Sequence, residues 1–316
     1  MNDMRAALFD SYGPPDVLYV GRVPVPEPRP GQVLVRVHAV SVNGGELHGR
    51  AGRLRLVTGR RFPQRTGIDF AGEVAADAAG FRTGAPVWGA LSRTFGAAAE
   101  FVAVDADRLA PAPAGTDLIE AAALPAVGTT AITALRDKAR LRPGERLLVR
   151  GAGGGAGSAV VQLGHSMGAH VTALASAKTC EFVRGLGADE AFDYATTRPA
   201  DLGRRFDVVL DTVGTDLPAW RGLLAPGGRM VGITFDTRHV LTSLASVAAS
   251  AVHGRGRIRF FSGNPRRELL ADLARRTTSG AIRPVVHEVF PLERIADAHR
   301  ALETGGVRGK IVVAVR

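Results

Sequence analysis

The chain has 316 residues, of which 46% are hydrophobic, and a formal net charge of +10 at pH 7. This length is enough for a large core and favours two domains. No apolar run reaches the roughly 20 residues of a membrane-spanning helix, and the N-terminus lacks a secretory signal pattern. We therefore expect a cytoplasmic protein with no membrane partner. The single cysteine, Cys180, excludes an intramolecular disulfide and a cysteine-built zinc site.

The positive charge is spread along the chain. Aromatic residues make up only 6% of the sequence, and no block of five or six consecutive basic residues occurs. We therefore predict a solvated basic surface and no nucleic-acid partner. One local concentration stands out, and we expect it near the active-site entrance, where it could attract anionic substrates: Arg50, Arg53, Arg55, Arg60, Arg61 and Arg65.

The predicted elements change in character along the chain. The first 120 residues or so alternate short β-like runs with Pro/Gly turns, which indicates a mainly β half. From Gly144 onwards, strands alternate with helices, which predicts a doubly wound parallel sheet. The candidate strands are 146–150, 170–175, 191–193, 206–211, 229–233 and 258–261. The prediction ends with four more elements: a helix over 265–279, a strand near 285, a helix over 292–303 and a strand over 310–315.

The stretch from Arg146 to Ala175 is typical of the opening βαβ unit of a dinucleotide-binding domain. Small residues occupy the A-x-G-x-x-G positions, where a pyrophosphate needs close approach to the backbone and the next helix points free N–H groups at it. The predicted pyrophosphate turn is Ala152, Gly153, Gly154, Gly155, Ala156 and Gly157.

The end of the second strand of this unit bears on the choice of cofactor. An acid there would accept hydrogen bonds from the adenosine ribose of NADH and repel a 2′-phosphate. The chain carries Ser176 and Lys178 instead, a hydroxyl and a cation that suit a phosphate. This favours NADPH over NADH, with a merely solvated Lys178 as the alternative.

The order of motifs resembles the zinc-independent, zeta-crystallin-like quinone oxidoreductases of the medium-chain dehydrogenase/reductase superfamily. The resemblance covers nearly the whole chain and rests on several segments: MRAALFDSYGPPDVLYV, SVNGGELHGRAG, GIDFAGEV, AAALPAVGTTAITAL, RPGERLLVRGAGGGAG, DTVG and RGKIVVAV. It implies an α/β protein with a GroES-like catalytic domain over 1–123, completed by 265–316. A Rossmann NADPH-binding domain would span 124–264, with the active site in the cleft between the domains.

The resemblance also implies roles for single residues. Asn43 matches an asparagine beside the nicotinamide, His48 a residue facing the substrate, and Thr130 a threonine near the carboxamide. His48 could donate a proton to a developing oxyanion, or be a loop histidine while water supplies the proton. Thr130 could equally be a helix N-cap. Glu46 stands where the family usually has Asp, which makes it doubtful as a site residue. Further phosphate contacts implied by the resemblance are Tyr194, Arg308 and Lys310.

Two more segments should border the cofactor, because ligands of doubly wound folds collect at the carboxyl edge of the sheet. The segments are Val213–Gly214 after the fourth strand and Phe261, Ser262 and Gly263 after the sixth. Trp88 and Phe95 could be apolar walls of the pocket, with core packing as the default for both.

A zinc ion is not expected from the ligands available. A catalytic zinc takes about three Cys, His, Asp or Glu ligands. Where zinc-containing relatives carry Gly-His-Glu, this chain reads Gly67-Ile68-Asp69. We interpret Asp69 as a structural turn carboxylate, and we expect hydrogen bonds to polarise the substrate oxygen.

The sequence therefore predicts an enzyme that transfers a hydride from NADPH to a quinone or an α,β-unsaturated carbonyl compound. An enoyl-thioester reductase is the alternative within enzymes. A noncatalytic NADPH-binding or RNA-binding, crystallin-like protein is the alternative outside them. The apolar run over 257–261 would form a sheet edge, which predicts a homodimer by edge pairing, with a helix over 241–252 covering part of the interface.

Overall fold

The computed structural model describes residues 3–91, 95–203, 205–234, 258–261 and 263–316. The chain divides into two compact units, unit 1 (Met1–Thr129 with Asn264–Arg316) and unit 2 (Thr130–Gly263). Helix α4 (Pro125–Ile132) runs through the first division, so no loop marks it. The predicted boundaries at 123/124 and 264/265 stay predictions. Ser262 and the predicted helix over 241–252 lie outside the described residues.

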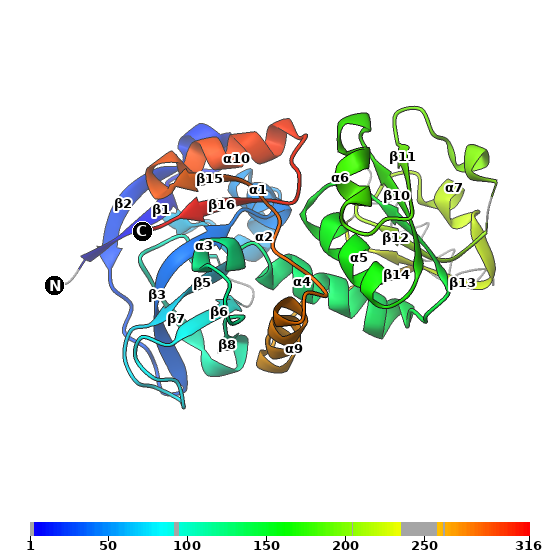
Figure 1. Cartoon of the computed structure of the whole chain (residues 1–316). Helices are drawn as coiled ribbons and strands as arrows, with labels where there is room; N and C mark the ends of the chain where they lie inside the picture. Colours follow the sequence, from blue (N-terminus) through cyan, green and yellow to red (C-terminus); the bar gives the residue numbers. More distant parts are fainter. Residues whose placement is uncertain (1–2, 92–94, 204, 235–257, 262) are drawn as a thin grey trace. The chain divides into compact units, whose positions relative to one another are not determined.

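Unit 1 is built on two sheets (Figure 1). The smaller has the order β2-β1-β4, and the larger has the order β15-β16-β3-β5-β6-β8, with β7 paired to β3. Its strands are β1 (Asp3–Phe9), β2 (Tyr19–Pro24), β3 (Gln32–Ser41), β4 (Gln64–Arg65), β5 (Asp69–Val74), β6 (Pro86–Ala90), β7 (Phe101–Asp105), β8 (Leu109–Pro111), β15 (Val286–Pro291) and β16 (Lys310–Ala314). Its helices are α1 (Gly44–Arg50), α2 (Arg55–Thr58), α3 (Leu118–Ala121), α4, α9 (Arg267–Thr278) and α10 (Ile295–Thr304).

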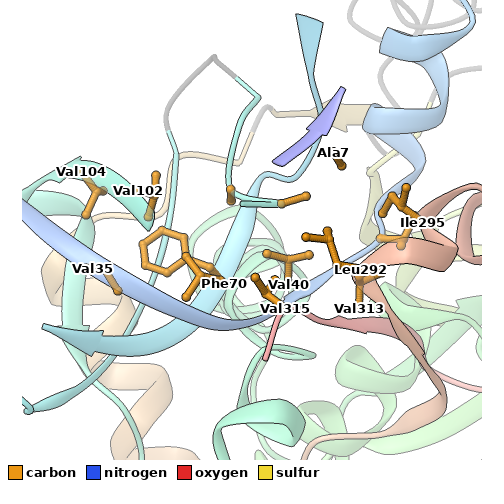
Figure 2. Packing of buried hydrophobic residues seen from close by; sticks show 14 of the residues in the cluster. Ala7, Val35, Val40, Phe70, Val102, Val104, Leu292, Ile295, Val313 and Val315 are labelled. Carbon is orange, nitrogen blue, oxygen red and sulfur yellow. The ribbon is translucent and has the colours of Figure 1, made fainter. Parts of the chain in front are cut away.

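The core of unit 1 joins both ends of the chain. Phe70 of β5 lies among valine side chains of β3 and β7, and Val313 and Val315 reach the same cluster from the C-terminus (Figure 2). Strand β16 pairs antiparallel with β3, with Val312 opposite Ser41. Burial of this apolar surface therefore holds the last strand beside the segment that begins at Ser41.

Unit 2 contains a six-stranded parallel sheet in the order β11-β10-β9-β12-β13-β14. Its strands are β9 (Arg146–Arg150), β10 (His170–Ala175), β11 (Glu190–Asp193), β12 (Phe206–Asp211), β13 (Leu224–Gly232) and β14 (Ile258–Phe260), and its helices include α5 (Gly155–Ser166), α6 (Cys180–Arg184), α7 (Leu217–Arg221) and a π-helix (Thr133–Ala139). In chain order this is 3-2-1-4-5-6, the dinucleotide-binding arrangement. The predicted fold class is confirmed.

Helix α5 packs closely on this sheet (Figure 1). A Cβ on Gly164 would lie 2.6 Å from Leu147 Cδ2 of β9, so any larger residue would force that side chain to move. The side chains of Val160, Val161 and Leu163 are buried. The helix therefore starts directly over the carboxyl end of β9, where a phosphate would meet its N-terminus.

Candidate active site

A cluster of polar side chains is buried in unit 1 where β3, α1, β5 and β16 meet. Isolated polar groups are expensive to bury, so each needs a hydrogen-bond partner. We call this cluster the buried polar network, and it consists of Ser41, Asn43, Glu46, Thr66, Asp69 and Lys310.

Asp69 is one centre of the network. It is fully buried at the first position of β5. Its carboxylate accepts from Ser41 Oγ at 2.8 Å, from Asn43 Nδ2 at 2.9 Å and from the backbone N–H of Ala126 at 3.1 Å. The structural role predicted for Asp69 agrees with these contacts, although the residue lies on a strand and also orients Asn43.

Glu46 is the second carboxylate of the network and is 3% exposed. It accepts from Asn43 Nδ2 at 2.9 Å, from Thr66 Oγ1 at 3.0 Å and from the Gly67 backbone N–H at 3.0 Å. Burial raises the pKa of Glu46 to about 7, against the hydrogen bond from Asn43, which lowers it. The longer side chain found in place of the family's Asp is therefore integrated in the site.

Lys310 closes the network from β16. Its ammonium donates to Val42 O at 2.6 Å and to Asn43 Oδ1 at 2.7 Å. The residue is 5% exposed, and burial lowers its pKa against the opposing effect of the Asp69 and Glu46 carboxylates. Two acceptors of unit 1 therefore hold the ammonium, and the phosphate contact expected for Lys310 stays a prediction.

His48 lies on α1, so it is not the loop histidine of the alternative interpretation. Its Nδ1 is 3.2 Å from the guanidinium of Arg53. Burial lowers the pKa of His48, and the Arg53 charge lowers it further. Because the guanidinium can only donate, Nδ1 is the acceptor and the neutral ring carries its proton on Nε2. Phe95 packs on the same helix, since a Cβ on Gly49 would lie 2.9 Å from its ring.

The glycine turn of unit 2 has two kinds of glycine. A Cβ on Gly157 would lie 2.1 Å from Gly151 O, so that position holds helix and strand together. A Cβ on Gly154 would meet nothing closer than Gly151 O at 3.7 Å, which leaves this face of the turn open. Gly154 is also the N-cap of the 12-residue helix α5 and makes no side-chain cap. An open face at a helix N-terminus fits a cofactor pyrophosphate.

A buried ion pair stands beside this turn. Arg150 at the end of β9 lies 3.1 Å from Asp211 at the end of β12, with side chains 8% and 0% exposed. Arg150 also donates to Thr215 O at 2.8 Å, and its guanidinium lies 4.4 Å from the ring centroid of Trp220. Burial raises the pKa of Asp211, against the lowering effect of Arg150.

Asp211 in turn fixes the segment that follows β12. Its carboxylate accepts from the backbone N–H groups of Val213 at 2.9 Å and Gly214 at 3.1 Å. Gly214 has a φ of 85°, which favours glycine. Val213 is 42% exposed. The predicted cofactor wall therefore stands at the carboxyl edge of the sheet and is held there by an ion pair that sequence reasoning missed.

The predicted 2′-phosphate residues gather at the end of β10. Ser176 Oγ bonds Thr179 Oγ1 at 2.9 Å, and Lys178 is exposed in the following turn. Tyr194 is 63% exposed, and its backbone N–H donates to Ala175 O at 2.9 Å. The nearby carboxylate of Asp193 accepts from the Ala195 N–H of its own turn. Two strand ends thus bring Ser176, Lys178 and Tyr194 to one edge, whereas Arg308 lies exposed in unit 1.

Thr130 and Gly263 meet in unit 2, since a Cβ on Gly263 would lie 3.3 Å from Thr130 Oγ1. The N-cap interpretation of Thr130 is wrong, because α4 begins at Pro125 and Thr130 lies within it. Phe261 lies near Lys138, whose ammonium is 6.0 Å from the ring centroid. The segment after the sixth strand therefore lies beside Thr130, and the role of both at a nicotinamide site stays a prediction.

One other sequence interpretation changes, and the default interpretation of Trp88 as a core residue is confirmed. Arg50, expected in the exposed basic cluster, is 2% exposed and pairs with Glu303 of α10. The buried residues of the short helix α1 are Glu46, Gly49 and Arg50, so Arg50 lies on the inward face of the helix. Trp88 is fully buried in β6 and so belongs to the core. Cys180 begins α6, after the 3-10 helix Ala177–Thr179 that follows β10.

Within the described residues, no group of three or more His, Cys, Asp or Glu side chains is arranged to hold a metal ion. The same part of the chain has no helix of the length and apolarity needed to cross a membrane.

Two protein-family models match this chain. Residues 29–114 match the alcohol dehydrogenase GroES-like domain, and residues 186–313 match the zinc-binding dehydrogenase family model. The chain is 33% identical to the 2-methylene-furan-3-one reductase of Solanum lycopersicum, over 99% of this chain and 79% of that protein. It is also 33% identical to the NADPH-dependent alkenal/one oxidoreductase of Arabidopsis thaliana, over 98% and 79% of the two chains.

A solved structure supports the same family. The quinone oxidoreductase from Coxiella burnetii matches with a TM-score of 0.89 and 29% identity, over 100% of both chains. Together with the two-unit fold, the glycine turn and the full-length similarity, this establishes that the chain belongs to the quinone oxidoreductase family of the medium-chain dehydrogenase/reductase superfamily.

Proposed function

We propose that this chain is an NADPH-dependent oxidoreductase that transfers a hydride to a quinone or to the β-carbon of an α,β-unsaturated carbonyl compound. The observation that carries the proposal is 33% identity, over 98% of this chain, to an NADPH-dependent alkenal/one oxidoreductase. The open glycine turn at the start of α5 gives that similarity a physical basis. When bound, NADPH supplies the hydride.

In unit 2, we assign the pyrophosphate to the turn around Gly154, where added side-chain atoms would find open space. We assign the 2′-phosphate to Ser176, Lys178 and Tyr194. Lys178 offers a cation and Ser176 a hydroxyl, and both are suited to a phosphate. Val213 and Gly214 would form the wall against the nicotinamide, and Thr130 would contact its carboxamide.

In unit 1, we assign Asn43 to the nicotinamide and His48 to the acceptor. The buried polar network orients Asn43, because Lys310 donates to its Oδ1 while its Nδ2 donates to Asp69 and Glu46. The neutral His48 ring would donate a hydrogen bond from Nε2 to the oxygen that becomes negative as hydride arrives. Since a neutral imidazole is a weak acid, the proton itself would come from water.

A direct test uses NADPH deuterated at C4 with 1,4-naphthoquinone, a 2-alkenal and a saturated aldehyde as acceptors. Deuterium should appear at the β-carbon of the alkenal product, and the saturated aldehyde should not react. His48→Phe should lower kcat by about tenfold to a hundredfold, while NADPH binding stays unchanged. Background oxidation of NADPH with all conjugated acceptors would refute the proposal.

We also propose that the protein is a cytoplasmic homodimer. Among the described strands of unit 2, β14 is the last in the order of the parallel sheet, the position at which a second copy could extend the sheet by edge pairing. Light scattering at micromolar concentration should give twice the chain mass of 33.1 kDa. A mass of one chain would refute the dimer, and cell fractionation tests the compartment.

A further inference from the structure

Among the described residues, a set of arginines in unit 1 has no carboxylate partner. We call it the basic segment, and its members are Arg53, Arg55, Arg60, Arg61 and Arg65. The sequence has no Asp or Glu between Glu46 and Asp69. Several other arginines of unit 1 do pair with acids, as Arg5 does with Glu100 and Arg300 with Asp297. Within the described ranges, no ion pair joins a member of the basic segment to a carboxylate.

The loop that carries these charges is held in place. The hydroxyl of Tyr12 lies 2.8 Å from Thr58 Oγ1, and Gln64 Nε2 donates to Thr58 O at 3.3 Å. The ring of Phe62 packs edge-on against Tyr12 at 5.2 Å and against Phe9 at 6.1 Å. Like charges on an anchored loop cannot separate freely, so they create a positive potential that only an anion or solvent relieves.

The basic segment is continuous with the proposed reaction centre. Arg53 contacts the ring of His48 on α1, the helix whose N-cap is Asn43. Leu56 lies between the charges in sequence and is 96% exposed. An apolar side chain among cations suits a ligand that has both apolar parts and negative charges.

We propose that the basic segment binds the phosphorylated tail of the acceptor, so that the substrates are conjugated carbonyl compounds carrying one or more phosphate groups. The inference rests on the proposed function and names its substrate class. A small-molecule tail is favoured over a macromolecule because the charges begin at the residue assigned to the acceptor. Bidentate contacts of Arg with phosphate oxygens would supply the affinity.

The test compares acceptors that share one reacting group and differ only in charge: crotonyl-pantetheine, its 4′-phosphate and crotonyl-CoA. We expect kcat/KM to rise with each added phosphate, by about thirtyfold in total at low ionic strength, and the difference to shrink to a few-fold in 0.5 M salt. The increase in kcat/KM should come from a lower KM and not from a higher kcat, because the tail is remote from the reacting carbon.

The matched variants are the triple changes Arg55→Ser/Arg60→Ser/Arg61→Ser and Arg22→Ser/Arg29→Ser/Arg82→Ser, which remove equal charge from exposed positions of unit 1. The first should abolish the dependence on phosphate and leave kcat/KM for crotonyl-pantetheine and 1,4-naphthoquinone within about twofold. The second should leave the dependence intact.

Failure of this inference and failure of the proposed function would give different results. Turnover of naphthoquinone with equal kcat/KM for the three thioesters would overturn this inference and leave the proposed function standing. No turnover of any acceptor would overturn the proposed function itself. If the arginine triple variant instead lost binding to anionic phospholipid vesicles or to RNA, with no change in acceptor preference, the segment would be a macromolecular surface and the inference would be wrong.

Discussion

Lys310 Nζ lies 2.7 Å from Asn43 Oδ1 across 267 positions of sequence. The contact joins the last strand of the chain to the N-cap of α1 and leaves the Asn43 amide group facing both carboxylates of the buried polar network. The orientation of the residue assigned to the nicotinamide therefore depends on the C-terminal strand.

Removal of this ammonium should destabilise unit 1. In Lys310→Met, Glu46 and Asp69 lose the cation that offsets their burial, so we expect a loss of about 3 kcal/mol in the free energy of unfolding. Lys178→Met, at an exposed position, should change it by less than about 0.5 kcal/mol. Urea titration of both variants checks this, and equal midpoints would contradict it.

Glu46 should make stability depend on pH. Its pKa rises from an ordinary value of 4.5 to about 7 on folding, so the folded protein binds the proton more tightly. The stability is full below pH 4.5 and is lost as pH rises towards 7, by about 3 kcal/mol at most. The neutral Glu46→Gln side chain lacks this loss. Relative to wild type, the variant should therefore gain stability between pH 5 and pH 8, and urea unfolding at several pH values would reveal a flat difference if Glu46 were not responsible.

The pKa of Glu46 also depends on two other charged groups of the buried polar network, because Asp69 raises it and Lys310 lowers it. Asp69→Asn is the control, because it keeps the shape of the network while removing the second carboxylate. The difference between Glu46→Gln and wild type should become smaller in the Asp69→Asn background.

Arg150 and Asp211 should be energetically coupled. Arg150→Met leaves a buried carboxylate without its cation, for which we expect a loss of about 3 kcal/mol. Asp211→Asn combined with Arg150→Met should lose less than the sum of the single changes, with a coupling of at least about 1 kcal/mol. A double-mutant cycle in urea measures the coupling, and strict additivity would show that the pair contributes nothing.

Substitution of Gly157 should lower the stability of the protein, whereas substitution of Gly154 should weaken the binding of NADPH. Gly157→Ala places a Cβ 2.1 Å from Gly151 O, so we expect destabilisation by more than about 2 kcal/mol. Gly154→Ala has no such contact and should unfold within about 1 kcal/mol of wild type, yet bind NADPH at least about tenfold more weakly, because the new methyl group enters the phosphate space. Calorimetry with NADPH checks the second variant, where undiminished affinity would place the pyrophosphate elsewhere.

Lys178 should select between the two nicotinamide cofactors. Lys178→Ala removes the cation assigned to the 2′-phosphate, so the KM for NADPH should rise about tenfold while that for NADH stays within about twofold. Arg184→Ala, on helix α6 beyond the turn, is the control and should leave both values unchanged. An equal rise for the two cofactors would show that Lys178 does not contact the phosphate.

The order of elements could be predicted from the sequence because each signal is local. The apolar runs at Arg146–Arg150, His170–Ala175 and Phe206–Asp211 are strands with these same bounds in the structure. The glycine turn before α5 could also be predicted, since close approach to a backbone selects glycine over a short stretch, and its role as a pyrophosphate site stays a prediction. Helix bounds were less accurate, as Thr130 illustrates, because α4 begins five residues earlier.

The surroundings of single charges depended on the tertiary structure. Nothing near Arg50 in sequence indicates that it is buried against Glu303, and nothing near Lys310 indicates that its acceptors are Val42 and Asn43. Sequence determined the fold class and the position of the glycine turn, because periodicity and glycine spacing are properties of consecutive residues. Only the folded chain decided which charges are buried together, because burial and pairing depend on segments that the sequence keeps far apart.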